Sequence, residues 1–397
     1  MASAKCTTRS YGIEDGSIPG VMAATSNSVN TPTGGVGMCG QEYLRTLAAA
    51  GFGLELVTFE VDRRPLVRFR RRMRPRPYTC VIPPYVASDV AAVVRKTRAR
   101  YLFLHMVHTA PLAAPLRGEF GAEVEIVLLS HGLESMDYLH FLRCREEIAA
   151  ITKAAPARRS YLADQLCAES SQRQYIDHVF CLSPSEAEIE RWLGAKAVTW
   201  LPRTISGRRL SWRPQGNRIG FVGCLDHPPN ADGLMQFAGA LDTLAQPEVS
   251  LRVAGAPAAV GRRLAERFRS IEYLGPLTDD QLEAEAECWN CFVNPLFCYA
   301  RGCSTKLAVA LGWGIPVLTT PAGSRGYVWS NGNLPMADTP EGLARLAISM
   351  MNAETAATAR REVQLVVESS PSLDQVAGKV RNALFAGSAT RPVFSGQ

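Results

Sequence analysis

The chain has 397 residues, 47% hydrophobic and 20% charged, which is typical of a globular protein and long enough to predict two domains. Its net charge of +6 suits anionic ligands but is weaker than most dedicated nucleic-acid binders carry, so we expect no nucleic-acid partner. The eleven cysteines are scattered, several in apolar runs, which predicts reduced packing residues in a reducing cytoplasm rather than a disulfide framework.

The first half alternates predicted strands with predicted helices. A strand at Gly20–Ser26 leads into the loop Asn30–Gly37, and a helix follows over Gln41–Ala50. Further strands are expected at Leu54–Glu60, Tyr101–Met106, Val124–Ser130 and His178–Leu182, with helices between them at Ala87–Arg98 and Phe141–Ile151. This alternation predicts an α/β fold with a largely parallel sheet covered on both faces.

After the turn-rich passage that runs from Trp200 to Asn217, the pattern restarts. Strands are predicted at Arg218–Val222 and Ser250–Ala254, with a helix from about Asp232 between them. Later helices are predicted at Asp279–Glu287, Pro340–Met350, Ala357–Glu368 and Leu373–Phe385. The sequence therefore predicts two similar α/β domains, residues 1–200 and 201–397.

The segment Phe292–Tyr327 carries the strongest functional signal. It has the pattern of a buried strand, a polar loop, a short helix that stops at Gly314, and a second buried strand at Val317–Thr320. Because the loop lies where the helix begins, unpaired backbone N–H groups, hydroxyls and cations converge on one place. The groups expected to bind an anion such as a diphosphate are Arg301, Gly302, Ser304, Thr305 and Lys306.

Three other landmarks appear in order before this segment: Phe221-Val222-Gly223 with Asn230 and Gly233, then Val253-Ala254-Gly255, then Leu274-Gly275-Pro276-Leu277. Together, the four resemble the donor-binding domain of glycosyltransferases with the GT-B fold, and in particular the retaining glycosyltransferase family 4. The resemblance implies two facing Rossmann-like domains with a cleft between them, the first for an acceptor and the second for a nucleotide-sugar. It also implies that the last helix packs back on the first domain.

The resemblance further implies transfer of a sugar, with retention and without a metal or other cofactor. The donor is expected to be a nucleotide-sugar such as a UDP- or GDP-sugar, and the acceptor a cell-surface glycan or lipid-linked precursor. Besides the loop, the donor-binding residues that it implies are Gly35, Gly37, Arg203, Gly223, Asn230 and Gly275.

Two departures from the family pattern concern charge. Counting back from Gly314, the two glutamates usual in the family are replaced by Arg301 on the sugar side and Val309 on the ribose side. The basic pair that normally follows the first strand is also replaced, by Cys224 and the segment Asp226–Asn230. The donor phosphates must then be met by Arg301, Lys306, Arg203 and the helix N-terminus.

In the first half, His131 follows a predicted strand at the sheet edge where open α/β sheets bind ligands, and Glu134 comes three residues later. Both are candidate catalytic residues: the resemblance implies a histidine near the transferred sugar, which indicates His131, and an inverting reaction would need His131 or Glu134 as a base. The glycines of Gly34–Gly37 allow close backbone approach to a ligand, although any tight strand-to-helix turn uses them too. Outside that role, Glu134 is interpreted together with Asp137 and His140 as a surface or acceptor-side group.

The basic run from Arg63 to Arg76 is interleaved with apolar residues, which suits an anionic membrane surface, while a solvated loop is the plainer interpretation. No apolar run approaches the roughly 20 residues that cross a bilayer, and residues 1–19 lack the core of a secretory signal, so a cytoplasmic enzyme at the inner membrane face is expected.

Three alternatives stay open. Cys288 and Cys291, with Cys298 and Cys303, superficially suggest zinc, but the spacings match no standard cluster and no metal is expected. The same fold also serves nucleotide-sugar epimerases and hydrolases. The missing acidic pair would equally suit a catalytically inactive accessory subunit that binds a partner enzyme.

Overall fold

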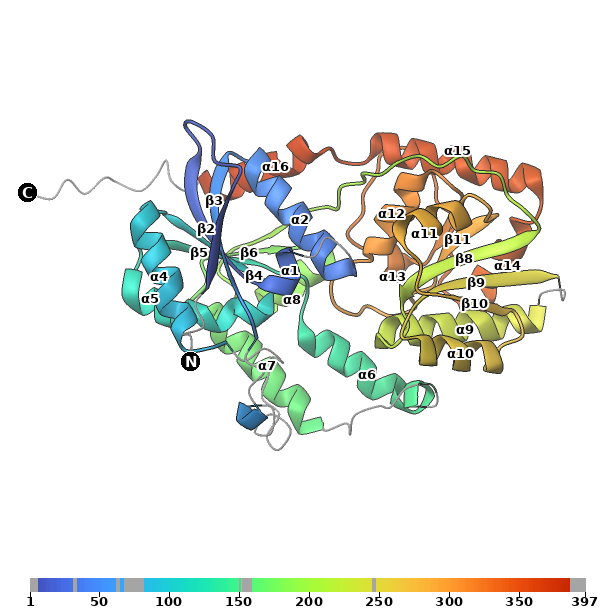
Figure 1. Cartoon of the computed structure of the whole chain (residues 1–397), viewed down its shortest axis with the longest axis horizontal. Coiled ribbons are helices and arrows are strands. Elements are labelled where there is room, and N and C mark those ends of the chain that lie inside the picture. Colours follow the sequence, from blue (N-terminus) through green and yellow to red (C-terminus); the bar gives the residue numbers. More distant parts are fainter. Residues whose placement is uncertain are drawn as a thin grey trace, which may run out of the picture. The chain divides into compact units, whose positions relative to one another are not determined.

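The structure is a computed structural model that describes residues 6–30, 34–61, 65–67, 82–149, 151, 159–244 and 248–385. The chain forms two compact units (Figure 1). The first comprises residues 1–134, 160–204 and 371–397, and the second comprises residues 135–159 and 205–370. The sequence predicts a single boundary at residue 200. In the structure, residues 135–159 of the first half belong to the second unit, and residues 371–397 of the second half belong to the first.

The first unit is built on a seven-stranded sheet in the order β1-β3-β2-β4-β5-β6-β7. β1 pairs with β3 antiparallel and every other pairing is parallel. The central strands are apolar runs buried along most of their length, as expected for a sheet covered on both faces. The strands are β1 Thr7–Tyr11, β2 Ile18–Thr25, β3 Phe52–Phe59, β4 Tyr101–His105, β5 Glu125–Leu129, β6 His178–Cys181 and β7 Val198–Trp200.

Helices connect these strands and supply the rest of the first unit. The last helix, α16, packs against α2, and Arg381 of α16 donates a hydrogen bond to the carbonyl oxygen of Ala49 (Figure 1). The helices are α1 Ser26–Val29, α2 Gly34–Ala49, α4 Tyr85–Thr97, the 3₁₀ helix η1 Val107–Leu112, α5 Ala113–Phe120, α7 Arg159–Arg173, α8 Pro184–Trp192 and α16 Leu373–Phe385.

The second unit has a five-stranded, fully parallel sheet in the order β10-β9-β8-β11-β12. β8 is central, so the strand order reverses between β8 and β11, and open α/β sheets bind ligands beyond the carboxyl ends of the strands at such a reversal. The strands are β8 Asn217–Cys224, β9 Val249–Ala256, β10 Ile271–Gly275, β11 Cys291–Asn294 and β12 Val317–Thr319.

Successive residues of β11 face opposite sides of this sheet, which divides the core in two. Cys291 and Val293 join an apolar cluster with α6, α9, α10 and α14, whereas Phe292 joins one with α12 and α15 on the other face. The helices are α6 Glu134–Ala149, α9 Pro228–Leu244, α10 Ala258–Arg267, α11 Asp279–Ala286, α12 Thr305–Trp313, α13 Pro321–Ser324, α14 Pro340–Ser349 and α15 Ala353–Ser369.

The predicted strands are confirmed to within a few residues, but the loop predicted at Asn30–Gly37 is wrong in its second half, because α2 already begins at Gly34. A Cβ on Gly40 of this helix would overlap the carbonyl oxygen of Ser28 at 2.3 Å, so glycine permits α2 to pack closely on α1. This packing outweighs the poor helix propensity of the glycines. Similarly, the helix expected from Asp232 starts at Pro228, which suits the first turn of a helix.

Each described cysteine is a free thiol, and Cys39, Cys144, Cys181 and Cys291 are buried. Among the described helices, none combines the length and apolar character needed to span a membrane. Most of the basic run from Arg63 to Arg76 lies outside the described residues.

Candidate functional site

The segment that carries the strongest sequence signal forms β11, a loop, α12 and β12 of the second unit. The loop is fixed at both ends. The Ser304 hydroxyl donates to Oδ1 of the buried Asn294 at 3.0 Å, and the Tyr327 hydroxyl donates to the Ser304 carbonyl oxygen at 2.5 Å. Ser304 is the N-cap residue of α12, but its side chain does not cap the helix. The Leu307 N–H donates to the Ser304 carbonyl oxygen and the Ala308 N–H to the Tyr327 hydroxyl, which leaves the N–H groups of Thr305 and Lys306 for another acceptor.

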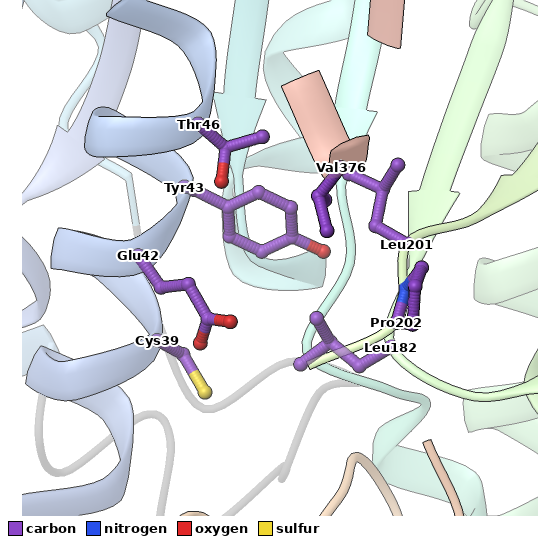
Figure 2. A pocket seen from close by; sticks show the side chains of 8 residues that line it. All are labelled: Cys39, Glu42, Tyr43, Thr46, Leu182, Leu201, Pro202 and Val376. Carbon is purple, nitrogen blue, oxygen red and sulfur yellow. The ribbon is translucent and has the colours of Figure 1, made fainter. Parts of the chain in front are cut away.

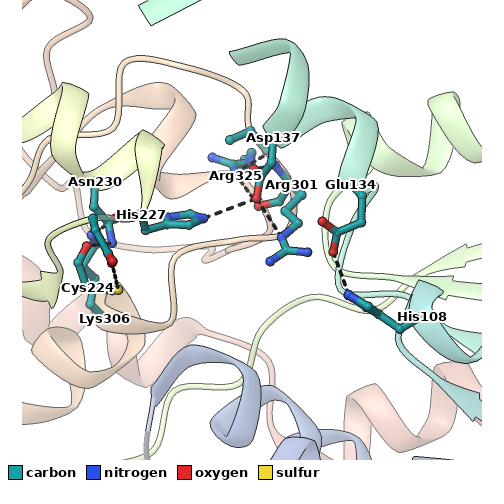
Figure 3. Close-up of polar contacts among 11 residues, drawn as sticks. His108, Glu134, Asp137, Cys224, His227, Asn230, Arg301, Lys306 and Arg325 are labelled. Carbon is teal, nitrogen blue, oxygen red and sulfur yellow. Dashed lines mark hydrogen bonds and ion pairs between the residues drawn. The ribbon is translucent and has the colours of Figure 1, made fainter. Parts of the chain in front are cut away.

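Lys306, in the first turn of α12, presents a half-buried ammonium group (Figure 3). Its Nζ donates to Oδ1 of Asn230 at 2.5 Å and lies 4.8 Å from the centre of the Phe221 ring. Burial lowers the pKa of Lys306 from 10.5 to about 7, and the nearby Cys224 opposes this shift. Within the described residues, no carboxylate pairs with this ammonium group. Such a desolvated cation is a good receptor for an added anion.

Two residues of the first sequence landmark surround Lys306. Asn230, near the start of α9, is oriented by its own Nδ2, which donates to the Cys224 carbonyl oxygen at 3.0 Å. A Cβ on Gly223 would lie 3.3 Å from Nδ2 of Asn230 and 3.5 Å from Nζ of Lys306. The structure therefore brings together Gly223, Asn230 and Lys306, which the sequence predicted as separate donor-binding residues.

Arg301, the other predicted cation of the loop, is already paired. Asp137 of α6 accepts the Arg301 backbone N–H at 2.9 Å, and its second carboxylate oxygen lies 2.8 Å from Nε of Arg301 (Figure 3). Nε2 of His227 lies 3.3 Å from that same oxygen. Burial lowers the pKa of Arg301 from its usual value of 12.5. Arg301 is thus held in place by Asp137, with much of its charge balanced.

Arg325 also supports the loop. Its guanidinium donates to the carbonyl oxygens of Ala300 at 2.8 Å and Arg301 at 3.2 Å. The sequence interpretation missed Arg325 and His227 and took Asp137 for a surface or acceptor-side group. Asp137 precedes Arg301 by 164 positions, so no local pattern in the sequence connects them.

The remaining predicted donor-binding residues of the second unit lie at loop and strand ends. Gly302 and Gly275 adopt left-handed backbone conformations, with φ of 66° and 85°, that favour glycine. Thr305 is the first residue of α12. Val309, at the position that resembles the ribose site, is partly buried against the apolar cluster of α12 and α15. Its side chain cannot accept a ribose hydroxyl.

In the first unit, His131 follows β5 and is buried between two aromatic rings. Its ring stacks on Tyr43 with 5.5 Å between centroids and meets the ring of His105 edge-on at 4.5 Å. Burial lowers the pKa of His105 to about 3, so this neighbour is neutral near pH 7. Glu134 lies 3.3 Å from Nε2 of His108 (Figure 3).

Arg203 also belongs to the first unit, where it is almost fully buried. It pairs with the Glu42 carboxylate of α2 at 2.5 Å and contacts Sγ of Cys39 at 2.7 Å. Figure 2 shows Cys39 and Glu42 beside Tyr43 in a pocket of this unit. The predicted glycines Gly35 and Gly37 lie in the first turn of the same helix, Gly35 exposed and Gly37 buried.

Comparison with known proteins agrees with this fold. Residues 216–353, which include β8, α9 and α12, match the family model described as glycosyl transferases group 1. A search of curated protein sequences finds no match.

Several solved structures share the fold at low identity. Sucrose-phosphate synthase from Thermosynechococcus elongatus is 16% identical, with a TM-score of 0.66 over 93% of this chain and 100% of that one. HepE from Anabaena, in complex with UDP and glucose, is 11% identical, with a TM-score of 0.59 over 93% and 100%. The lipopolysaccharide outer core galactosyltransferase WaaB is 12% identical, with a TM-score of 0.56 over 93% and 99%.

The predicted resemblance is therefore confirmed: the protein has the GT-B fold, and its second unit contains a glycosyl transferases group 1 segment. This places it in the class of enzymes that transfer sugars.

Proposed function

We propose that the protein transfers a sugar from a nucleotide-sugar to a glycan or lipid-linked acceptor, and that it binds the donor diphosphate at Lys306. The supporting observation is the half-buried ammonium of Lys306, held by Asn230 and Phe221 and not paired with a carboxylate within the described residues. Burial takes the ammonium group of Lys306 out of water without giving it a charged partner, and a bound diphosphate would supply the opposite charge.

The backbone around Lys306 suits the same ligand. The N-terminus of α12 provides N–H groups and the positive end of the helix dipole. The absence of a side chain at Gly223 leaves space next to Nζ of Lys306. Cleavage of the sugar–phosphate bond places negative charge on the leaving diphosphate, and these groups would stabilise that charge in the transition state. Lys306 would thus supply positive charge beside the leaving diphosphate.

The geometry of Arg301 suggests a different task. Because Asp137 balances its charge and fixes its orientation, Arg301 is suited to position the sugar or phosphate by hydrogen bonds. We propose that transfer proceeds with retention, with a donor phosphate oxygen taking the acceptor proton. His131 and Glu134 are proposed as catalytic residues of the first unit.

For the acceptor, the proposal rests on the sequence. The basic run from Arg63 to Arg76 belongs to the acceptor half of the chain and suits an anionic membrane surface. A lipid-linked glycan precursor at the cytoplasmic face is the acceptor class that agrees with it.

A thermal-shift screen against UDP-, GDP-, ADP- and dTDP-sugars tests the proposal. A ligand that binds only the native state raises the melting temperature. At a concentration of 100 times its Kd, it raises the free energy of unfolding by about 2.7 kcal/mol. Stabilisation by one nucleotide family, followed by release of its diphosphate when glycan acceptors are added, would support the proposal. No stabilisation by any of these nucleotide-sugars would refute it.

A further inference from the structure

A second cluster of reactive side chains lies in the second unit, on the two helices that carry Asn230 and Asp137. His140 and Cys144 are one turn apart on α6, and Asp232 comes from α9; both helices are labelled in Figure 1. All three residues are buried, with exposed fractions of 9%, 8% and 8%. Nothing in the proposed transfer reaction uses them.

The three side chains converge on one point. Nε2 of His140 lies 3.4 Å from Sγ of Cys144 and 3.5 Å from Oδ2 of Asp232, and all three atoms lie within 4.8 Å of one another. Zinc bonds of about 2.0–2.3 Å in tetrahedral geometry put neighbouring ligand atoms roughly 3.3–3.8 Å apart. The two separations at Nε2 of His140 match the edges of a zinc tetrahedron, and the third pair of ligand atoms lies within 4.8 Å.

The donor atoms are also of the right kind. Imidazole nitrogen, thiolate sulfur and carboxylate oxygen together favour Zn²⁺ over Mg²⁺ or Ca²⁺, which prefer oxygen ligands only. The Asp232 carboxylate is oriented by Gln236, whose Nε2 donates to Oδ2 at 2.9 Å, as outer hydrogen bonds commonly orient metal-binding carboxylates.

Charge balance gives a further argument. A cation in a buried site is stabilised when its ligands carry the opposite charge. On binding Zn²⁺, the Cys144 thiol releases its proton to solvent and forms the zinc–sulfur bond. One thiolate and one carboxylate then neutralise the two charges of the cation within a buried site.

We propose that His140, Cys144 and Asp232 bind a Zn²⁺ ion that fastens α6 to α9, with a solvent molecule as the fourth ligand. Asp137 lies one turn before His140 on α6 and holds Arg301, so the ion would also fix the helix that positions this loop. This site differs from the cysteine group Cys288, Cys291, Cys298 and Cys303, for which the sequence predicted no metal.

The test is the metal content and the Co²⁺ spectrum of untagged, full-length protein. After removal of metal with a chelator, we expect about one equivalent of Zn²⁺ or Co²⁺ to rebind per chain. The Co²⁺ form should show the thiolate-to-cobalt charge-transfer absorption of a cysteine ligand. Cys144→Ser should abolish that absorption, whereas the control Cys288→Ser, at a half-buried cysteine of the same unit, should retain it.

Asp232→Asn provides a second variant that changes only one side-chain atom, in case Cys144→Ser does not fold. Loss of an outer or direct ligand commonly lowers metal affinity by at least about 10-fold, and we expect this for Asp232→Asn, measured by competition with a chromogenic chelator. Wild-type protein that binds no Zn²⁺ and shows no thiolate–cobalt absorption would overturn the proposal. Unchanged affinity in Asp232→Asn would also overturn it. None of these measurements depends on a nucleotide or on sugar transfer.

Discussion

Replacing Lys306 with methionine should produce two effects of opposite sign. Methionine preserves much of the side-chain volume but removes the ammonium group beside Asn230 and Phe221. The binding of a nucleoside diphosphate should weaken, because a charge-assisted contact is lost. The stability of the protein without ligand should rise, because a desolvated cation is removed.

The magnitudes follow from the environment of Lys306. A hydrogen bond to a charged group contributes about 1.5–3 kcal/mol, so the Kd for a nucleoside diphosphate should rise about 10- to 150-fold. The pKa shift from 10.5 to about 7 sets an upper bound of about 5 kcal/mol on the cost of burying the charged form. After the lost hydrogen bond to Asn230 is deducted, a gain of about 1–3 kcal/mol is expected, seen as a melting temperature higher by several degrees.

The assays are calorimetric titration with nucleoside diphosphates and thermal unfolding without ligand, both near pH 6.5. Lys196→Met is the matched control, since it removes the same charge from an exposed side chain of the first unit that lies 3.4 Å from Asp177. A Lys306→Met variant that behaves like the control in both assays would show that Lys306 is neither desolvated nor in the donor site.

Three further predictions concern the same site. Because the pKa of Lys306 is lower in the folded protein, the unfolded chain binds more protons between pH 7 and 10.5, so the stability of the wild type should rise with pH through this range. The diphosphate affinity should fall by up to about tenfold per pH unit above pH 7, as Lys306 loses its charge. Calorimetric titrations at several pH values would detect or exclude this fall. Asp137→Asn should lower kcat/KM for the nucleotide-sugar by about 10- to 150-fold, because Arg301 loses a charged partner that contributes about 1.5–3 kcal/mol. Steady-state kinetics that match the wild type would rule out this positioning role. Gly223→Ala should weaken diphosphate binding with little change in folding, since its Cβ would press on Asn230 at 3.3 Å; unaltered binding by calorimetry would place the phosphates elsewhere.

Local sequence patterns predicted the second unit well. Gly314 ends α12 in a left-handed conformation, as its position after the apolar run indicates. The apolar runs of β8, β9 and β11 alternate with turn signals, so their type and order were predictable. These same patterns placed Lys306 at the start of a helix.

Long-range partners were not predictable in this way. Asp137 contacts Arg301, which lies 164 positions later in the chain. Asp232 of α9 contacts His140 of α6. Both contacts form because α6 packs into the core of the second unit. Likewise, α2 extends through four glycine-rich positions that propensity assigns to a loop, because Gly40 allows close packing on α1. Sequence periodicity describes one element at a time, so it contains no signal for contacts of this kind.

The most direct test of the central claim is a calorimetric comparison of UDP and GDP with uridine and guanosine on the wild-type protein at pH 6.5. If Lys306 and the N-terminus of α12 bind the donor diphosphate, one nucleoside diphosphate should bind at least about tenfold more tightly than its nucleoside. Equal affinity of the diphosphate and its nucleoside would contradict the account.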